Sequence, residues 1–197
     1  MTIAALLWDF GDTLVDERWM LRPPADFANW PAVWSEVVTE RAHDWNIGHL
    51  TEADIFSDLA TRTGMERVAI ERHAAACCRS IQFHTAAWRA VTERRLPQAL
   101  VTVNPDLFVE RVARPYALAE HFDAVIVSCI EGTDDKNELC LIALDRLGFA
   151  GPRSEGLLVD NRDDLTQAWI RVGGSAYHFQ SDERFEIDWP RMLGSAP

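Results

Sequence analysis

The stretch from Leu6 to Leu14, LLWDFGDTL, constrains the fold more than any other, because its apolar run stops at Asp9. Buried strands of parallel sheets are short apolar runs, since both faces of the sheet are covered. A carboxylate directly after such a strand lies at its carboxyl end, where open α/β proteins bind ligands. Gly11, Asp12 and Thr13 follow, and Gly and Asp also favour plain turns. The stretch therefore predicts a buried strand that leads either into a ligand site or into an Asp-rich turn.

Further apolar runs extend this pattern along the chain. Five segments have the length and composition of buried strands: Ala4–Trp8, Ala99–Val103, Ala124–Val127, Gly156–Val159 and Ser175–Phe179. Between the later ones, apolar residues recur at three- and four-residue spacing, which predicts helices over Asp106–Tyr116, Asn137–Leu147 and Asp164–Val172. Alternating strands and helices are typical of a parallel sheet covered on both faces. We therefore expect an α/β fold with a Rossmann-like, three-layer core.

A long segment without a convincing strand separates the first two predicted strands. Its apolar spacing predicts helices over Ala32–Asp44, Glu52–Thr63, Glu66–Ile81 and Thr85–Arg94. Prolines mark its two ends, at Pro23, Pro24 and Pro31 and again at Pro97. We expect a core of residues 1–15 and 97–197 and an α-helical cap of residues 16–96. An insertion directly after the first strand lies above the crevice, where it acts as a lid.

The tail and the charge balance are less specific. After Phe179 we expect an irregular strap that frays at its last residues. With 31 acidic and 19 basic side chains the net charge is −12, which argues against nucleic acid and anionic membranes as partners. The N-terminal apolar run is too short to span a membrane.

The four cysteines lack CxxC spacing, so we expect reduced, buried thiols in a cytoplasmic protein.

Polar residues of a matched kind stand at four predicted strand ends. They are Asp9 after the first strand, Thr102 at the end of the second, Lys136 after the third and Asp160 at the end of the fourth. In this order they resemble the haloacid dehalogenase superfamily, mostly phosphohydrolases, whose motifs are a nucleophilic Asp, a Ser or Thr, a Lys and one or two acidic metal ligands. The resemblance covers nearly the whole chain, from about Thr2 to Phe179. Each motif is weak alone, but their order and the helical insertion are jointly specific.

The resemblance implies a catalytic role for three of these residues. Asp9 would attack the substrate and become an aspartyl-phosphate, Thr102 would donate a hydrogen bond to the phosphoryl oxygens, and Lys136 would bridge the phosphate and Asp9. Phosphoryl transfer needs such an in-line nucleophile with positive charge around the transferring group. A lysine at the start of a helix is also unusual, because the helix dipole disfavours cations there.

The same resemblance implies a Mg²⁺ cofactor. Its ligands would be Asp9, the Gly11 carbonyl and Asp160, with Asn161 or Asp164 filling a further position. Mg²⁺ is a hard cation that prefers oxygen ligands. Two strand-end acids side by side also repel each other unless a cation compensates them.

The chain departs from the family pattern in its first motif. Phosphatases of the superfamily usually read Asp-x-Asp-Gly-Thr, and the second Asp protonates the leaving group and later activates water. Gly11 stands at that position and cannot transfer a proton, a contribution usually worth about 10² to 10⁴ in rate. Asp12 either replaces it after a backbone shift or caps the turn. Asp12 and Asn104, which follows Thr102 by two residues, are the candidate substrate-binding residues.

Three functions remain open at this point. We expect a Mg²⁺-dependent phosphohydrolase, monomeric or homodimeric, that acts on a small phosphorylated metabolite. The first alternative is a metal-free 2-haloacid dehalogenase, since those enzymes lack the second Asp of the first motif and carry Ser-Asn-x-x-Asp in the fourth. Asn161 and Asp164 match that pattern, whereas Asp160 does not. The second alternative is a phosphate-binding or partner-binding homologue that has lost the acid/base.

Overall fold

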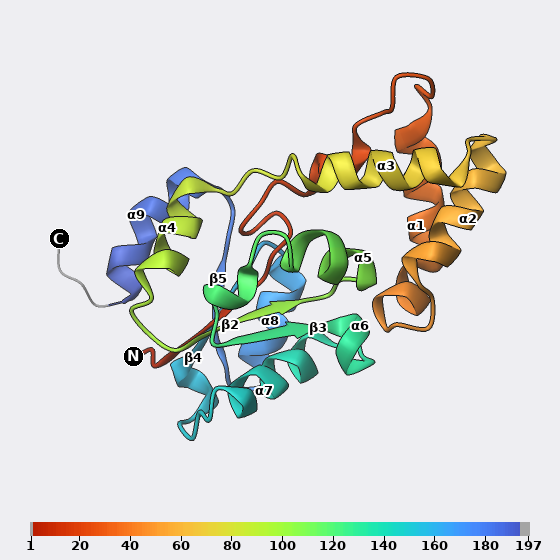
Figure 1. The fold of residues 1–197 in the computed structure, drawn as a ribbon. Helices are drawn as coiled ribbons and strands as arrows, with labels where there is room; N and C mark the ends of the chain where they lie inside the picture. The colour runs from red at the N-terminus through yellow and green to blue at the C-terminus, as the bar shows by residue number, and fades with distance from the viewer. Residues whose placement is uncertain (1, 194–197) are drawn as a thin grey trace.

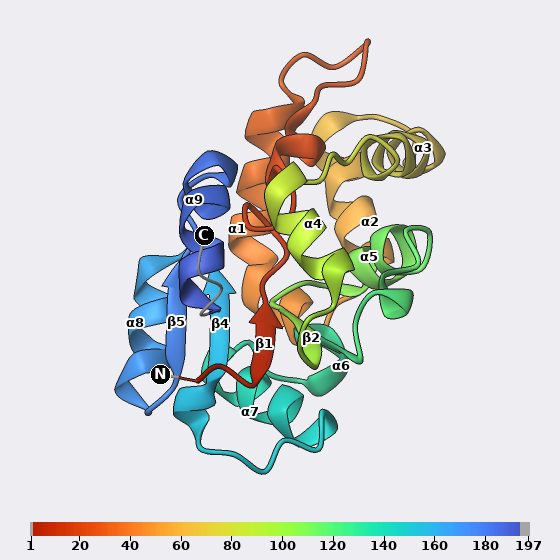
Figure 2. The same ribbon diagram turned by 90° about the vertical axis from the view of Figure 1, so that its left-hand side faces the viewer.

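A five-stranded parallel sheet forms the centre of the computed structural model, which describes residues 2–193. The strands are β1 (Ala5–Trp8), β2 (Gln98–Thr102), β3 (Ala124–Val127), β4 (Gly156–Asp160) and β5 (Ser175–His178). They lie in the order β3-β2-β1-β4-β5, and Figure 2 shows β2, β1, β4 and β5 side by side. The five predicted strands are confirmed. The chain runs from β1 to β2 on one side while β4 lies on the other, so the carboxyl ends of β1 and β4 border a topological switch point.

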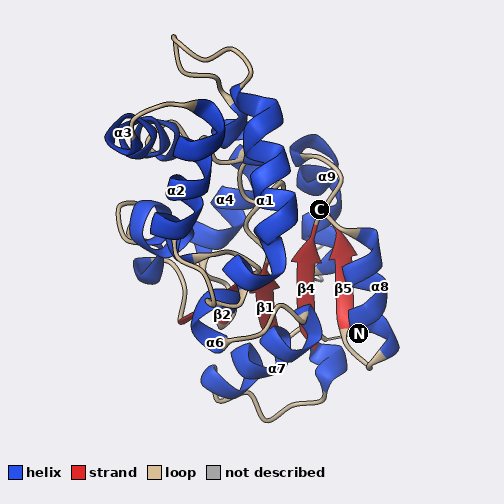
Figure 3. Ribbon diagram, turned by 90° about the vertical axis from the view of Figure 1, so that its right-hand side faces the viewer, coloured by secondary structure: helices blue, strands red, loops and turns tan. Residues whose placement is uncertain are grey.

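Helices cover both faces of this sheet, as Figure 3 shows. On one face Leu7, Val101 and Ile126 pack in a cluster with α7 (Lys136–Arg146) and α8 (Asp163–Arg171). On the other face lie α4 (Thr85–Glu93), α9 (Asp182–Met192) and α5 (Asp106–Phe108), which continues as a π-helical turn over Val109–Ala113. The expected α/β fold with a three-layer core is confirmed. Between β3 and α7 the chain adds the short helix α6 (Ser128–Glu131).

The insertion after β1 is helical, as the apolar spacing predicts. It begins with the 3-10 turn η1 (Glu17–Leu21) and continues through α1 (Trp30–Asn46), α2 (Glu52–Thr63) and α3 (Arg67–Cys78). Figure 1 shows α1, α2 and α3 gathered at one end of the molecule. Tryptophans form the centre of this bundle: the Trp30 and Trp34 rings stack with centroids 5.7 Å apart, and Trp45 packs edge-on against Trp34. Aromatic pairs of this kind contribute beyond the area that they bury.

The fourth helix of the insertion, α4, lies beside α9 and away from α1–α3 (Figure 1). The Asp182 carboxylate of α9 accepts hydrogen bonds from the backbone N–H groups of Ala86, at 2.8 Å, and Ala87, at 3.0 Å. Because α4 and α9 both cover the sheet, we propose that the cap ends near Ser80 and that α4 belongs to the core. The predicted cap of residues 16–96 would then be too long at its C-terminal end.

The segment after Phe179 forms the regular helix α9, so the prediction of an irregular strap is wrong. Ser181 caps this helix by accepting from the Arg184 N–H, and Phe185 and Trp189 lie one turn apart on its buried face. Pro190 removes only one backbone donor near the helix end. The expected fraying of residues 194–197 falls outside the described residues. Over residues 2–193, the helices are too short or too polar to cross a membrane.

Candidate active site

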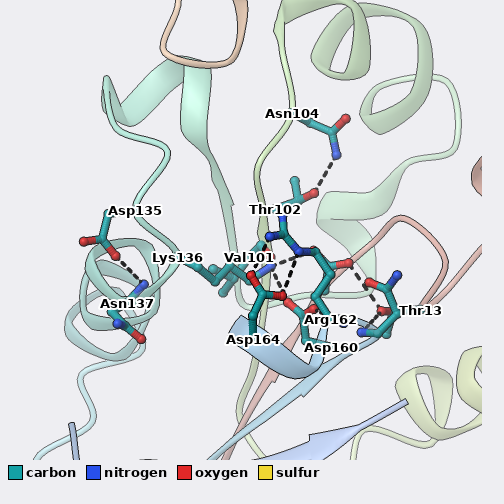
Figure 4. A network of polar contacts seen from close by, with 12 residues as sticks. Thr13, Val101, Thr102, Asn104, Asp135, Lys136, Asn137, Asp160, Arg162 and Asp164 are labelled. Atoms are coloured by element: carbon teal, nitrogen blue, oxygen red, sulfur yellow. Dashed lines mark hydrogen bonds and ion pairs between the residues drawn. The ribbon is translucent and has the colours of Figure 1, made fainter. Parts of the chain in front are cut away.

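A buried ammonium faces two carboxylates at the carboxyl ends of β1 and β4. Asp9 directly follows β1, Asp160 ends β4, and Lys136 begins α7. The Lys136 Nζ donates to Asp9 Oδ1 at 2.6 Å and lies 3.0 Å from Asp160 Oδ2. It also donates to the Val101 carbonyl at 2.7 Å (Figure 4). Lys136 is 3% exposed and Asp160 1%, so these two side chains are almost fully buried.

The charges of this trio are strongly coupled. Burial raises the pKa of Asp9 above its ordinary value, the nearby Lys136 opposes this, and Asp160 adds to it. Burial favours the neutral amine of Lys136, but the charges of Asp9 and Asp160 raise the pKa of Lys136 above its ordinary value. With all three groups ionised, two carboxylates and one ammonium leave one net negative charge in the crevice. Such a site favours a cation.

The oxygen atoms around Asp160 fit a hard cation. Asp160 Oδ2 is buried without a hydrogen bond, since its contact with Lys136 lacks hydrogen-bond geometry, while Oδ1 accepts from the Arg162 N–H at 2.9 Å. Gly11 and Asn161 line the same cavity. In the described part of the chain, no three His, Cys, Asp or Glu side chains gather as a metal cluster. A Mg²⁺ ion here would therefore combine two carboxylates with carbonyl or amide oxygens, which Mg²⁺ accepts.

Thr102 and Asn104 stand on the other side of this cavity, whose volume is about 200 Å³. Asn104 Nδ2 donates to the Thr102 hydroxyl oxygen at 2.6 Å (Figure 4). Sequence reasoning overlooked Thr13, whose hydroxyl donates to Asp9 Oδ2 at 3.3 Å and accepts from the Asn161 N–H at 3.0 Å. Thr13 thus links the loops after β1 and β4. The sequence signal that could have found Thr13 is its place in the segment Gly11-Asp12-Thr13, which follows the first predicted strand and Asp9.

Two predicted residues lie outside this cavity. Asp164 is bound by Arg162 through contacts of 2.6 Å and 3.1 Å, and its side chain is 65% exposed (Figure 4). Asp12 has a φ of 50°, and its Oδ1 accepts from the Glu17 N–H at 2.9 Å. Of the two roles that the sequence left open for Asp12, the structure therefore shows the turn cap.

Glu17 is the acidic residue of this cavity that no motif spacing marked. It begins η1, and a Cβ built on Gly11 would lie 2.6 Å from Glu17 Cδ and 2.7 Å from each carboxylate oxygen. Solvent reaches much of Glu17, but its carboxyl group lies close to protein atoms. This burial, together with the charges of Asp9 and Asp12, raises the pKa of Glu17 to about 7.

A second, larger chamber of about 440 Å³ adjoins the first. Both are lined by Glu17, Asn46, Val103 and Asn104. The chamber walls also include the rings of Trp19, Trp34 and Trp45. Its one basic wall residue, Arg18, is held by Asp16 at 2.6 Å. The chamber therefore suits an apolar or aromatic group better than a charged one.

The fold of this chain is similar to those of several solved structures, although its sequence has no recognisable relatives among family models or curated proteins. A predicted HAD-like family hydrolase from Porphyromonas gingivalis matches at 15% identity over 98% of each chain, with a TM-score of 0.71. A HAD family enzyme from Bacteroides thetaiotaomicron, in complex with magnesium and inorganic phosphate, matches at 16% identity over 91% of this chain and 95% of that chain, with a TM-score of 0.67.

An L-2-haloacid dehalogenase from Xanthobacter autotrophicus has a similar fold. It matches at 16% identity over 95% of this chain and 82% of that chain, with a TM-score of 0.65. Identities of this size establish a shared fold and leave the reaction open, because one fold hosts several chemistries. The resemblance drawn from the four strand-end residues is thus confirmed for the architecture. The chain has the α/β fold of the haloacid dehalogenase-like (HAD-like) hydrolases, with a helical insertion after β1.

Proposed function

We propose that this protein is a Mg²⁺-dependent phosphohydrolase that transfers the phosphoryl group of a small metabolite to Asp9. The observation that carries the proposal is the convergence of Asp9, Asp160, Lys136 and Thr102 at the switch point of the sheet. A neighbour in fold that binds magnesium and inorganic phosphate supports it. We further propose a cytoplasmic protein, monomeric or homodimeric, that binds its small substrate and neither nucleic acid nor membrane.

Lys136, Thr102 and Asp9 each have a separate role in the proposed reaction. Lys136 holds Asp9 in one orientation through the 2.6 Å hydrogen bond and provides positive charge for an incoming phosphate. The Thr102 oxygen already accepts from Asn104, so its own hydroxyl hydrogen is free to donate to a phosphoryl oxygen. Asp9 then attacks phosphorus in line with the leaving oxygen and carries the phosphoryl group as an acyl phosphate.

Electrostatics favour a metal-dependent reaction. With all three groups ionised, Asp9, Asp160 and Lys136 together carry one net negative charge before a phosphate dianion enters. Bound Mg²⁺ would reduce the repulsion between the anionic nucleophile and the anionic substrate. Asp9 and Asp160, with the Gly11 carbonyl and Asn161 as further oxygen donors, are the residues that would hold it.

One observation favours a second candidate, the metal-free 2-haloacid dehalogenase. Lys136 contacts both carboxylates, so that a single ammonium compensates them in part without a metal. In that reaction Asp9 would attack the carbon that carries the halogen and displace halide. The dehalogenase among the fold neighbours makes this a concrete alternative.

The test is an assay of phosphate and chloride release, with EDTA or with added Mg²⁺, over a panel of phosphate monoesters and 2-chloropropionate. We expect phosphate release that requires Mg²⁺ and no chloride release. Asp9→Asn should abolish turnover, because an amide is a poor nucleophile. Chloride release in EDTA would establish the dehalogenase instead. Turnover of neither class would contradict both enzyme proposals and favour the binding homologue.

A further inference from the structure

The first motif lacks its usual proton donor because residue 11 is glycine, yet a carboxyl group occupies that space. We propose that Glu17 is the general acid and base of this site and that it protonates the leaving oxygen of esters whose organic part is apolar. This inference rests on the proposed phosphohydrolase function. It assigns a catalytic residue that no motif of the sequence indicates.

The contact between Gly11 and Glu17 carries the argument. The φ of Gly11 lies outside the left-handed region, so its backbone conformation would accept a side chain. A Cβ at this position would lie 2.6–2.7 Å from three heavy atoms of the Glu17 carboxyl, which would have to move aside to admit it. Real Cβ atoms do not approach other atoms so closely. The Glu17 carboxyl therefore fills the volume into which a side chain at residue 11 would project.

Neighbouring residues hold Glu17 in this place by its backbone. Asp12 Oδ1 accepts from the Glu17 N–H at 2.9 Å, and Asp16 caps η1 by accepting from the Arg18 N–H at 3.0 Å. Among residues 2–193, no hydrogen bond or ion pair engages the Glu17 carboxylate itself. The backbone of Glu17 is thus held beside Gly11 while its carboxylate oxygens stay available, which makes Asp12 a positioning residue for Glu17.

The position of Glu17 between the two cavities suits proton transfer to a leaving group. It lines the cavity that contains Asp9, Thr102 and Lys136, and it also lines the chamber with the rings of Trp34 and Trp45. A phosphoryl group bound against Lys136 would leave its organic part in the chamber. The bridging oxygen between them would then lie at the boundary that Glu17 shares.

In the proposed reaction, Glu17 gives up a proton in the first of two steps and takes one back in the second. In the first, an Asp9 oxygen bonds to phosphorus, the bond from phosphorus to the ester oxygen breaks, and its electron pair takes the Glu17 proton to give the alcohol. In the second, the Glu17 carboxylate takes a proton from water as the water oxygen bonds to phosphorus. The bond to Asp9 then breaks, which releases phosphate and restores both carboxyl groups.

The test compares the wild type with Glu17→Gln on two monoesters that each carry a ring, 4-nitrophenyl phosphate and 2-phenylethyl phosphate, with Mg²⁺ present. Nitrophenolate leaves without a proton, whereas an alkoxide needs one. For 2-phenylethyl phosphate we expect kcat/KM to fall by about 100-fold or more. In a single turnover of 4-nitrophenyl phosphate we expect the loss to stay below about five-fold, followed by slow dephosphorylation.

Two further variants separate proton transfer from structural damage. Asp16→Asn keeps the cap of η1 beside Glu17, because Asn also caps, and should leave the ratio between the two esters unchanged. Glu17→Ala should lose the alkyl ester activity. Adding Gly11→Asp to Glu17→Ala should restore it by about ten-fold or more, since the space is then free for a carboxyl on residue 11.

The possible results separate a failure of the role of Glu17 from a failure of the proposed phosphohydrolase function. Equal losses on both esters in the single-turnover measurement, or no loss on the alkyl ester, would overturn the role of Glu17 while leaving the proposed function in place. Rescue by Gly11→Asp of a folded but inactive Glu17→Ala protein would exclude a merely structural role. A wild-type protein that releases no phosphate from either ester would overturn the proposed function, and the role of Glu17 with it.

Discussion

At the residue scale, Lys136 determines the electrostatics of the site. Its ammonium is buried between Asp9 and Asp160 and also donates to the Val101 carbonyl. Breaking a buried pair by removing one partner is costly because the remaining charge has no compensation. Here the removal of one cation would leave two carboxylates facing each other.

Replacing Lys136 by Met tests this directly. In the Mg²⁺-free protein we expect Lys136→Met to lower the free energy of unfolding by about 3–5 kcal/mol, measured by urea denaturation in EDTA. Added Mg²⁺ should recover part of the loss, because the cation compensates the same two carboxylates. Arg146→Met is the matched control at the far end of α7, where the Arg146 side chain of the ion pair with Glu131 is 45% exposed, so that its loss should cost less. Equal losses for the two variants would contradict this electrostatic account.

The residues at the strand ends were predictable from sequence, and those in turns were not. Asp9, Thr102 and Asp160 each end a readable apolar run, and the carboxyl ends of parallel strands meet at one edge of the sheet. Glu17 reaches the site only because the turn from Gly11 to Asp16 folds back on itself, with Asp12 in a left-handed conformation. The spacing of residues in the sequence does not reveal that this turn brings Glu17 back to the site.

At the element scale, the packing of α4 on α9 joins segments that are far apart in the sequence. The N-terminus of α4 has no cap from its own residues, and the Asp182 carboxylate of α9 supplies it. The rings of Trp189 and Phe185 on α9 pack against Trp8 of β1, with centroids 5.2 Å and 6.0 Å away. These contacts make α9 part of the layer that covers the sheet.

We predict that Asp182→Ala lowers the free energy of unfolding by about 1 kcal/mol or more, since it leaves the Ala86 and Ala87 donors of α4 without their acceptor. Asp182→Asn is the matched control and should retain part of this stability, because an amide oxygen also caps a helix. Chemical denaturation of the three proteins measures the difference. An Asp182→Ala protein as stable as the wild type would show that α4 does not depend on α9.

Element prediction succeeded where local signals agree and failed where they conflict. The helix Glu52–Thr63 was predicted at its observed bounds from apolar spacing. In the structure the local signals agree with it, since Thr51 and Asp54 form a capping box and Gly64 ends the helix in a left-handed conformation. The tail was misjudged because Pro190 indicates a break, whereas in the structure it lies in the last turn of α9 and removes one backbone donor there. The shorter cap that we propose depends on tertiary contacts of α4 with α9, which the sequence does not state.

At the scale of the whole molecule, the cap and the core are closely joined. One hydrophobic cluster runs from the tryptophans of α1 to one face of the sheet, while the other face has its own cluster under α7 and α8. Polar contacts cross the same boundary: the Asp106 carboxylate accepts from Trp45 Nε1 at 2.8 Å and from the Glu52 N–H at 2.9 Å. Glu52 is also bound by Arg111 at 2.6 Å. The cap is thus held over the crevice and forms part of the walls of the chamber beside Glu17.

The central claim is that Asp9 carries the phosphoryl group during turnover. Its most direct test is rapid acid quench of Glu17→Gln during reaction with 4-nitrophenyl phosphate and Mg²⁺, followed by mass spectrometry of the peptide that contains Asp9. We expect that peptide to gain one phosphoryl group, which hydroxylamine removes, and Asp9→Asn to gain none. A peptide without the added phosphoryl group, while nitrophenolate is released, or a phosphoryl group on another residue, would contradict the account.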